Sequence, residues 1–432
     1  MASAEAIERI WAREVLNFLG NPTVEAEVIL ADGSYGKSAV PAGISTGSSE
    51  AIQLLDGDPK RFQGKGVLKA VENVRRLIAP ALKGMKATRQ KEIDEKLLNL
   101  DGTSNKSRLG ANAILAVSLA TAYAAAASLK TPLYRYLGGE GPFRLPVPAF
   151  DMLAGGAHAQ SSVDFQEYLV IPSGVSSFQE ALQAGANVYR VLKEVLEMKG
   201  YSIREVGGPY TPSLGSNQEG VELMAAAIEK AGYSLGKECF IGIDAASSEL
   251  YQNGNYALTG EGRNLNSLAM VDLWAEWVEA YPIVSIEDGL AEEDWEGWQA
   301  LTKRIGDKVQ LVGDDFFTTH PNRLRKGIKL KAANAVLIKP NQIGTLTETL
   351  EAMRIAREAG WGAMLSSRSG ETEDATISDL AVLEGAGQLK SGPPCRQCIV
   401  KYNRLLRIAD ELGEKGEYAG SWVSKFYGKK VS

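Results

Sequence analysis

The feature that most constrains the fold of this chain is a repeated pattern in its second half. Short apolar runs alternate there with amphipathic helical stretches, and a charged or polar residue follows each run. The runs cover residues 240–243, 283–286, 309–312, 335–338 and 363–365, and the residues after them are Asp244, Glu287, Asp314, Lys339 and the triplet Ser367, Arg368 and Ser369. Repeated strand-then-helix units predict a parallel sheet. The long spacing between Asp244 and Glu287 indicates an insertion in that unit.

Polar residues at the ends of successive parallel strands meet at one edge of a sheet, as in the active sites of (β/α)₈ barrels. A doubly wound open sheet would gather such residues similarly, near the point where its strand order reverses. The pattern leaves both α/β architectures open, and we favour the barrel.

The first third of the chain predicts a small α+β domain instead. Residues 23–30 alternate as a strand does, and helical stretches follow over residues 66–77, 91–100 and 111–129. The turn-forming sequence GGEGP at 138–142 marks a boundary. We therefore expect an N-terminal α+β capping domain over residues 1–138 and a C-terminal barrel over residues 139–432.

Composition argues against several classes of protein. The 432 residues carry a net charge of -6 with both signs interspersed, so we expect no nucleic-acid partner. Three cysteines are too few for a disulfide framework, which indicates a reducing, cytoplasmic location. The N-terminal residues mix charges with apolar residues, unlike a signal peptide. The alanine-rich stretch 111–129 predicts a buried helix and no membrane span.

Three carboxylates at neighbouring strand ends repel one another unless a cation lies between them. Asp244, Glu287 and Asp314 offer only oxygen ligands, which select Mg²⁺ over Zn²⁺. A single acid at such a position is more often a helix cap or part of an ion pair, but three in succession favour a metal site. Lys339 at the next strand end could act as a general base if burial and the cation lower its pKa, or it could only neutralise the acids.

Two further features suit a phosphorylated substrate and a lid. Arg368 with Ser369 offers a guanidinium fork and a hydroxyl for a phosphate or carboxylate. The glycine-flanked loop at 43–47 could close over the site and supply a hydroxyl to a metal.

Other signals carry less weight. The sequence GSYGKS at 33–38 has Ala31 where a phosphate-binding loop needs its first glycine. Cys395 and Cys398 have no second cysteine pair with which to form a zinc site. With two histidines in the chain a histidine-rich site is excluded, and His158 taken alone is more typical of a surface loop.

Motifs along the whole chain point to one family. They are VPAGISTG at 40–47, LGANAIL at 109–115, SIED at 285–288, VGDD at 312–315, KPNQIG at 339–344 and SRSGETED at 367–374. In these stretches the chain resembles the enolase (phosphopyruvate hydratase) family. The resemblance implies a capping domain and an enolase-type (β/α)₈ barrel whose first units depart from the simple repeat.

The resemblance also implies a metal site and a base. Asp244, Glu287 and Asp314 would hold a first Mg²⁺, and Ser45 in the lid would help to hold a second one that arrives with the substrate. Lys339 would remove the proton next to the substrate carboxylate. The pairing of Mg²⁺ with a lysine or histidine base is an established feature of that superfamily.

The remaining implied roles concern substrate binding. Lys390 would bind the substrate carboxylate or its enolate, and Arg368 and Ser369 would bind the phosphate. His158 and Glu167 match residues of the family's catalytic loops, which changes the expectation for His158 from a surface residue to a site residue.

The chain departs from the family where the leaving group is handled. Ser367 stands where enolases carry a histidine, although it remains a substrate-binding position. Pro209 stands where a glutamate protonates the departing hydroxide. Proline cannot donate a proton and serine is a poor acid, so we expect turnover to lose much of the ~10²–10⁴ that a general acid supplies. Glu167, Glu205 or water could substitute.

The sequence therefore predicts a lyase that eliminates water from 2-phosphoglycerate, as in glycolysis, or from a related phosphorylated or phosphonate hydroxy acid. Two alternatives stay open: a paralogue with a different substrate in secondary metabolism, and a non-catalytic enolase-derived binding or scaffold protein. The joint retention of metal ligands and base favours catalysis. The family implies a homodimer or an assembly of dimers.

Overall fold

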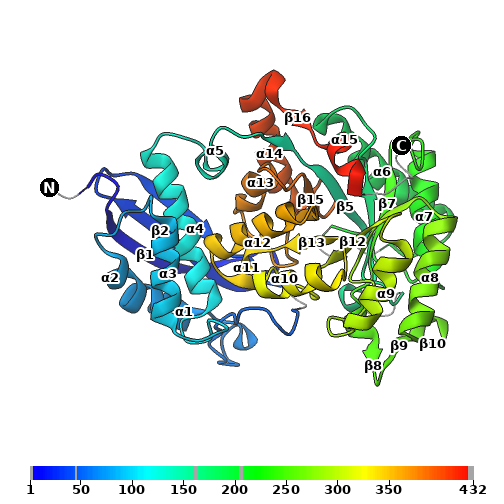
Figure 1. Ribbon diagram of the computed structural model, residues 1–432, viewed down its shortest axis with the longest axis horizontal. Coiled ribbons are helices and arrows are strands. Elements are labelled where there is room, and N and C mark those ends of the chain that lie inside the picture. The colour runs from blue at the N-terminus through cyan, green and yellow to red at the C-terminus, as the bar shows by residue number, and fades with distance from the viewer. Residues whose placement is uncertain (1–2, 44–45, 160–162, 204–207, 427–432) are drawn as a thin grey trace.

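The computed structural model describes residues 3–43, 46–159, 163–203 and 208–426. Figure 1 shows two groups of elements, with the blue-to-cyan N-terminal elements on the left and the barrel on the right. Helices α3 (Gln90–Asp101) and α4 (Ala111–Ser128) of the first group pack against α11 (Pro340–Ile343) and α12 (Leu346–Glu358) of the second.

The N-terminal group is an antiparallel sheet covered by helices. Its strands are β1 (Ile7–Leu16), β2 (Pro22–Leu30) and β3 (Tyr35–Ala39), and its helices are α1 (Leu68–Asn73), α2 (Ala79–Leu82), α3 (Gln90–Asp101), α4 (Ala111–Ser128) and α5 (Leu133–Gly138). Helix α4 packs on β2 and β3, and a side chain at Gly36 would meet the Ala120 carbonyl oxygen at 2.1 Å. The small residues at this contact let the helix and the sheet approach closely.

Helix α4 is long and apolar enough to cross a membrane by length and composition alone. In this fold, however, 83% of it is buried inside the protein. The expectation of a buried helix is therefore confirmed, because its alanine-rich surface packs against the sheet on one side and against other helices elsewhere.

Eight strands close the barrel in the order β11-β12-β13-β14-β15-β5-β6-β7, which confirms the predicted α/β barrel. Their bounds are β5 (Val147–Ala154), β6 (Glu167–Ile171), β7 (Phe240–Asp244), β11 (Ile283–Glu287), β12 (Gln310–Gly313), β13 (Ala335–Ile338), β14 (Gly362–Ser366) and β15 (Gln388–Ser391). Two short strands, β4 (Arg144–Leu145) and β16 (Glu417–Tyr418), pair with each other outside the barrel.

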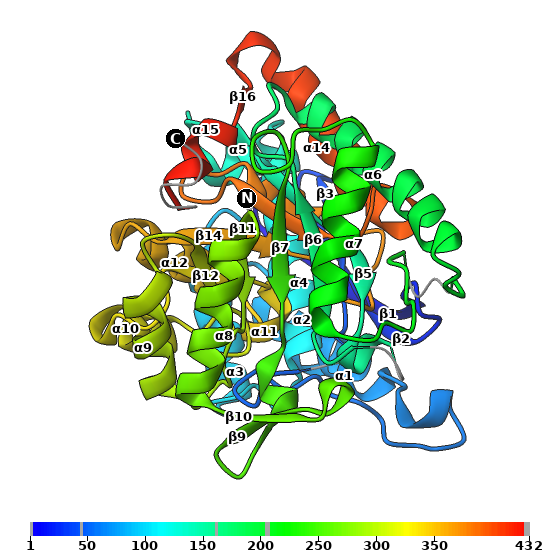
Figure 2. The ribbon, with the colours of Figure 1, turned by 90° about the vertical axis from the view of Figure 1, so that its right-hand side faces the viewer.

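Helices surround the barrel strands. They are α6 (Phe178–Met198), α7 (Asn217–Lys230), α8 (Ser267–Ala280), α9 (Trp295–Ile305), α10 (Pro321–Leu330), α11 (Pro340–Ile343), α12 (Leu346–Glu358), α13 (Thr376–Ala381), α14 (Ile399–Leu412) and α15 (Gly420–Val423). Figure 2 shows α6 and α7 side by side over β5, β6 and β7. The insertion predicted between Asp244 and Glu287 is a small sheet of β8 (Tyr251–Gln252), β9 (Asn255–Leu258) and β10 (Arg263–Asn266).

One strand of the barrel runs against the others. Strand β6 pairs antiparallel with both β5 and β7. Its first residue, Glu167, therefore lies at the mouth where the parallel strands end, opposite Asp244 of β7 and Ala154 of β5. This reversal adds a carboxylate to the mouth that a simple βα repeat would place at the other end.

Candidate active site

The barrel mouth gathers acidic residues around a lysine of β15. Asp244 and Glu287 are the last residues of β7 and β11, and both are buried. The ammonium Nζ of Lys390 lies 2.8 Å from Asp244 Oδ2, 2.6 Å from Glu287 Oε2 and 2.8 Å from Glu167 Oε2. Burial lowers the pKa of Lys390, but these three carboxylates raise it by more, to well above its ordinary value.

A second lysine contacts the third predicted ligand. Lys339 Nζ lies 2.5 Å from Asp314 Oδ2, and Gln342 donates a hydrogen bond of 2.7 Å to Asp314 Oδ1. Burial lowers the pKa of Lys339, while Asp314 and Glu287 raise it by more, so that it lies above its ordinary value. In this arrangement Lys339 is an ammonium, and its use as a base requires the contact with Asp314 to be relieved.

The charges at this mouth do not balance. The carboxyl groups of Glu167, Asp244, Glu287 and Asp314 share the two ammoniums of Lys339 and Lys390. Acidic groups therefore outnumber the ammoniums that they contact, which suits the binding of a further cation.

Glu287 provides a second sign that a cation fits here. Its Oε1 is buried and has no hydrogen-bond partner among the described residues. Burial, and then the charge of Asp244, raises the pKa of Glu287 well above its ordinary value. An oxygen-only ligand set with an unsatisfied buried carboxylate oxygen suits Mg²⁺.

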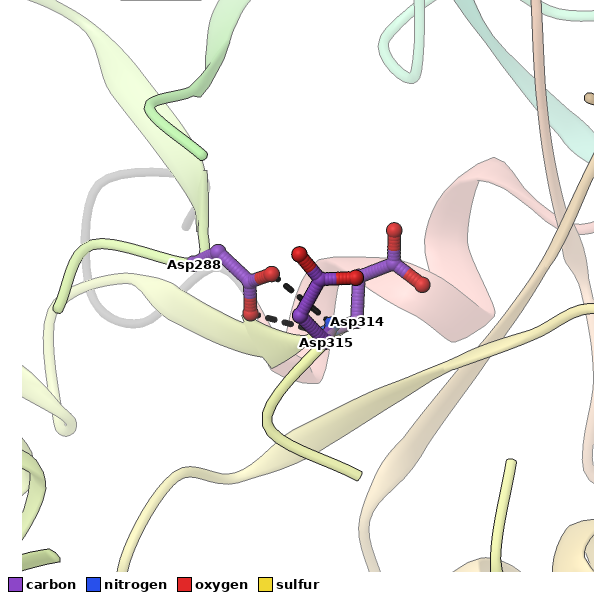
Figure 3. A group of neighbouring side chains, drawn as sticks. All are labelled: Asp288, Asp314 and Asp315. Atoms are coloured by element: carbon purple, nitrogen blue, oxygen red, sulfur yellow. Dashed lines mark hydrogen bonds between the residues drawn. The ribbon is translucent and has the colours of Figure 1, made fainter. Parts of the chain in front are cut away.

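A neighbouring acidic group holds two strand ends together (Figure 3). The carboxylates of Asp288, Asp314 and Asp315 lie within 4.8 Å of one another. Asp288 accepts the backbone N–H of Asp314 at 2.9 Å and that of Asp315 at 2.8 Å, so it joins the end of β11 to the end of β12. The backbone of Asp288 has a φ of 41°, a strained value for a residue other than glycine. Burial, and then Asp314, raises the pKa of Asp315 to about 8.

Arg368 connects the barrel to the segment that follows the predicted lid loop. Its guanidinium contacts Glu50 at 3.1 and 3.2 Å and Asn341 Oδ1 at 3.0 Å. Glu50 in turn accepts the backbone N–H of Gly47 at 3.2 Å. Arg368 is buried but lines the cavity beside Ser369.

A cavity of about 160 Å³ opens on these residues. Its polar wall includes Lys339, Arg368 and Lys390, while Leu19, Ala157 and Pro209 contribute apolar surface. Ser367 also lines it, and its hydroxyl lies 2.9 Å from Ser391 Oγ. The cavity therefore combines cationic groups suited to an anionic ligand with an apolar wall.

Three predicted site residues cannot be placed in this geometry. Ser45 and Glu205 lie outside the described residues, and so does the side chain of His158. The backbone of His158 ends a short 3₁₀ turn that follows β5.

Several residues at the site were not predicted from the sequence. Three of them form hydrogen bonds with predicted site residues: Glu50, Gln342 and Asp288. The fourth, Asp151, lines the cavity. The sequence could have indicated Asp288, because it is an acid next to Glu287. It could also have indicated Asp151, because this is the one charged residue in the apolar sequence VPAFDMLA.

Comparison with protein families gave two matches. Residues 7–137 match the family model described as Enolase, N-terminal domain. Residues 142–427 match the one described as Enolase, C-terminal TIM barrel domain.

Proposed function

This chain belongs to the enolase family, and we propose that it is a magnesium-dependent lyase that removes the proton next to a carboxylate and then eliminates water. The proposed substrate is 2-phosphoglycerate or a closely related phosphorylated or phosphonate hydroxy acid. The observation that carries the proposal is the buried contact of Lys339 with Asp314, beside the cluster of Asp244, Glu287 and Lys390.

In this proposal Asp244, Glu287 and Asp314 hold the Mg²⁺, and Ser45 contributes to a second ion. The excess of acidic groups over the ammoniums that they contact and the unsatisfied Glu287 Oε1 support it. When bound, Mg²⁺ would draw the charge of Asp314 away from Lys339 and stabilise the negative charge that develops on the substrate carboxylate.

The two lysines have different roles in the proposed reaction. Lys339, once relieved of Asp314, takes the proton from the carbon next to the carboxylate, and its burial favours the neutral amine. Lys390 keeps its positive charge and attracts the carboxylate. Arg368 and Ser369 bind the phosphate from the same cavity wall, and His158, the neighbour of the cavity-lining Ala157, contributes to substrate binding.

A second candidate function is supported by the apolar part of the cavity. Pro209 and Ser367 lie where the family resemblance places an acid and a histidine, and Leu19, Ala154 and Ala157 line the same cavity. Such a wall suits a substrate that differs from 2-phosphoglycerate at its leaving-group end. The enzyme would then be a paralogue acting in secondary metabolism.

One incubation separates these functions. The protein is mixed with Mg²⁺ and 2-phosphoglycerate in D₂O, and both exchange of the α-hydrogen and formation of phosphoenolpyruvate are followed. Exchange with product supports the first function, and exchange without product supports the second. Absence of both at saturating Mg²⁺ contradicts the proposed proton abstraction from 2-phosphoglycerate.

We extend the proposal to the assembly and location implied by the family: a homodimer, or an assembly of dimers, in the cytoplasm. Analytical ultracentrifugation would test the first part, and a monomer at micromolar concentration would contradict it.

A further inference from the structure

Asp151 is a buried acid for which the reaction above has no role. It lies in β5, whose eight residues are all buried, and its side chain lines the active-site cavity. Its Oδ1 is buried and has no hydrogen-bond partner within the described ranges. A buried carboxyl oxygen without a partner costs stability, so its presence beside a cavity indicates that it meets a ligand there.

Asp151 differs from the other acids that line this cavity, because each of those contacts a lysine ammonium. Glu167 and Asp244 contact Lys390, and Glu371 lies 2.5 Å from Nζ of Lys401. Pairing with an ammonium favours the charged form of an acid.

The surroundings of Asp151 favour the opposite state. No ion pair joins it to a cation in the described part of the chain, and the charged groups whose fields reach it are Glu167, Lys390 and Asp244. Burial, followed by the charge of Glu167, raises its pKa well above the ordinary value, against a smaller lowering by Lys390. Burial and the neighbouring charge of Glu167 therefore favour the protonated form of Asp151.

Pro209, the first of the two residues that differ from the family where the leaving group is handled, lies on a segment beside Asp151. Pro209 is followed by Tyr210, whose backbone forms a bridge to Leu153 of β5 and donates a hydrogen bond of 3.0 Å to the Met152 carbonyl. The segment that carries Pro209 therefore runs along β5, within two residues of Asp151.

Ser367, the second of these residues, is connected to β5 through the neighbouring strand β15. The hydroxyl of Ser367 contacts Ser391 of β15, and Ser391 pairs with Phe150, the neighbour of Asp151. Asp151 thus lies between the two places where the family resemblance loses its leaving-group residues.

Asp151 and the proposed base lie on well-separated strands of the barrel, and both line the cavity. Lys339 follows β13, and β5 lies three strands away from β13 in the ring of eight. The two side chains therefore approach a substrate from well-separated walls. This arrangement suits an elimination in which a proton leaves one carbon and hydroxide leaves the next.

We propose that Asp151 is the general acid that protonates the departing hydroxide, a role that Pro209 cannot fill; this rests on the proposed function. Lys339 takes the α-proton, and the electron pair of that C–H bond forms the C=C bond. The Cβ–O bond breaks, and the proton of Asp151 joins the hydroxide to give water. Lys339 then releases its proton to solvent, and the Asp151 carboxylate takes one from water.

The test compares Asp151→Asn with the wild type in D₂O with Mg²⁺ and 2-phosphoglycerate. We expect elimination to fall by ~10²–10⁴ while α-hydrogen exchange stays within about threefold, since only the leaving group needs the acid. Retained exchange also shows that the variant is folded. Asp94→Asn is the matched control, because Asp94 is equally buried with a raised pKa but lies outside the cavity.

A second substrate sharpens the result. In an analogue with fluorine in place of the β-hydroxyl, the leaving group departs as fluoride and needs no proton. Fluoride release by Asp151→Asn should match the wild type within about threefold.

Other outcomes overturn the assignment. Elimination of water by Asp151→Asn at the wild-type rate would do so, and so would an equal loss of exchange and of fluoride release. Exchange without elimination in the wild type would remove Asp151 as the acid but leave the proton abstraction intact. Absence of both in the wild type would overturn the proposed function, and the assignment with it.

Discussion

Nζ of Lys390 lies 2.6 Å from Oε2 of Glu287, and both side chains are buried. This contact leaves the other oxygen of Glu287 without a hydrogen bond among the residues described. The ammonium therefore offsets only part of the negative charge at the barrel mouth, and the rest is available to a cation.

Glu287→Gln should weaken Mg²⁺ binding, because it removes one charge and one ligand oxygen from the proposed site. In the wild type, Mg²⁺ at ~100 times its Kd should stabilise the folded state by about 2.7 kcal/mol. At the same Mg²⁺ concentration the variant should show less than half of that gain. Thermal unfolding with and without Mg²⁺ measures both.

Glu351→Gln is the control, since Glu351 pairs with Arg354 on the outer helix α12. It should keep the wild-type response to Mg²⁺. An equal Mg²⁺ response in Glu287→Gln and the wild type would remove Glu287 from the metal site.

Glu50→Gln should destabilise the protein strongly, because it leaves the buried guanidinium of Arg368 without its carboxylate. The two side chains are 8% and 4% exposed. Removing one partner of a buried pair typically costs about 3–5 kcal/mol. Urea unfolding measures the loss, and a change below about 0.5 kcal/mol would show that Arg368 does not depend on the Glu50 carboxylate.

His320 should make the stability depend on pH. Its Nδ1 accepts the backbone N–H of Asn322 at 3.2 Å and caps α10, which the protonated ring cannot do. Burial is the main cause that lowers the pKa of His320 in the folded state. The folded state thus binds fewer protons than the unfolded state, so this stability is present above about pH 6.5 and is lost as the pH falls below it.

His320→Asn supplies a cap that does not titrate. Between pH 7.5 and 5 the wild type should lose about 0.5–1 kcal/mol more stability than this variant. Urea unfolding measures the stability of both proteins at each pH. The difference between them removes the contribution of the other titrating groups. Identical losses would mean that the hydrogen bond from Asn322 to His320 makes no measurable contribution to stability.

The pattern of apolar runs predicted the barrel well. The run 335–338 is β13 to the residue, and Asp244 and Glu287 end their strands as expected. This worked because a buried parallel strand is a short apolar run, and its first polar residue marks where it reaches the mouth.

Strand direction was harder to predict, because apolar runs look the same in either direction. Nothing in the sequence of β6 shows that it runs antiparallel, although this reversal brings Glu167 to the mouth. Contacts between distant segments were equally hidden. Arg368 and Glu50 are 318 residues apart, and local pattern carries no information about such pairs.

The proposed role of Lys339 as the base is tested most directly by α-hydrogen exchange in D₂O. Lys339→Ala should exchange the α-hydrogen of 2-phosphoglycerate at least 10²-fold more slowly than the wild type while still binding Mg²⁺. Lys329→Ala, on the exposed surface of α10, should exchange at the wild-type rate. Exchange by Lys339→Ala at the wild-type rate would contradict the mechanism.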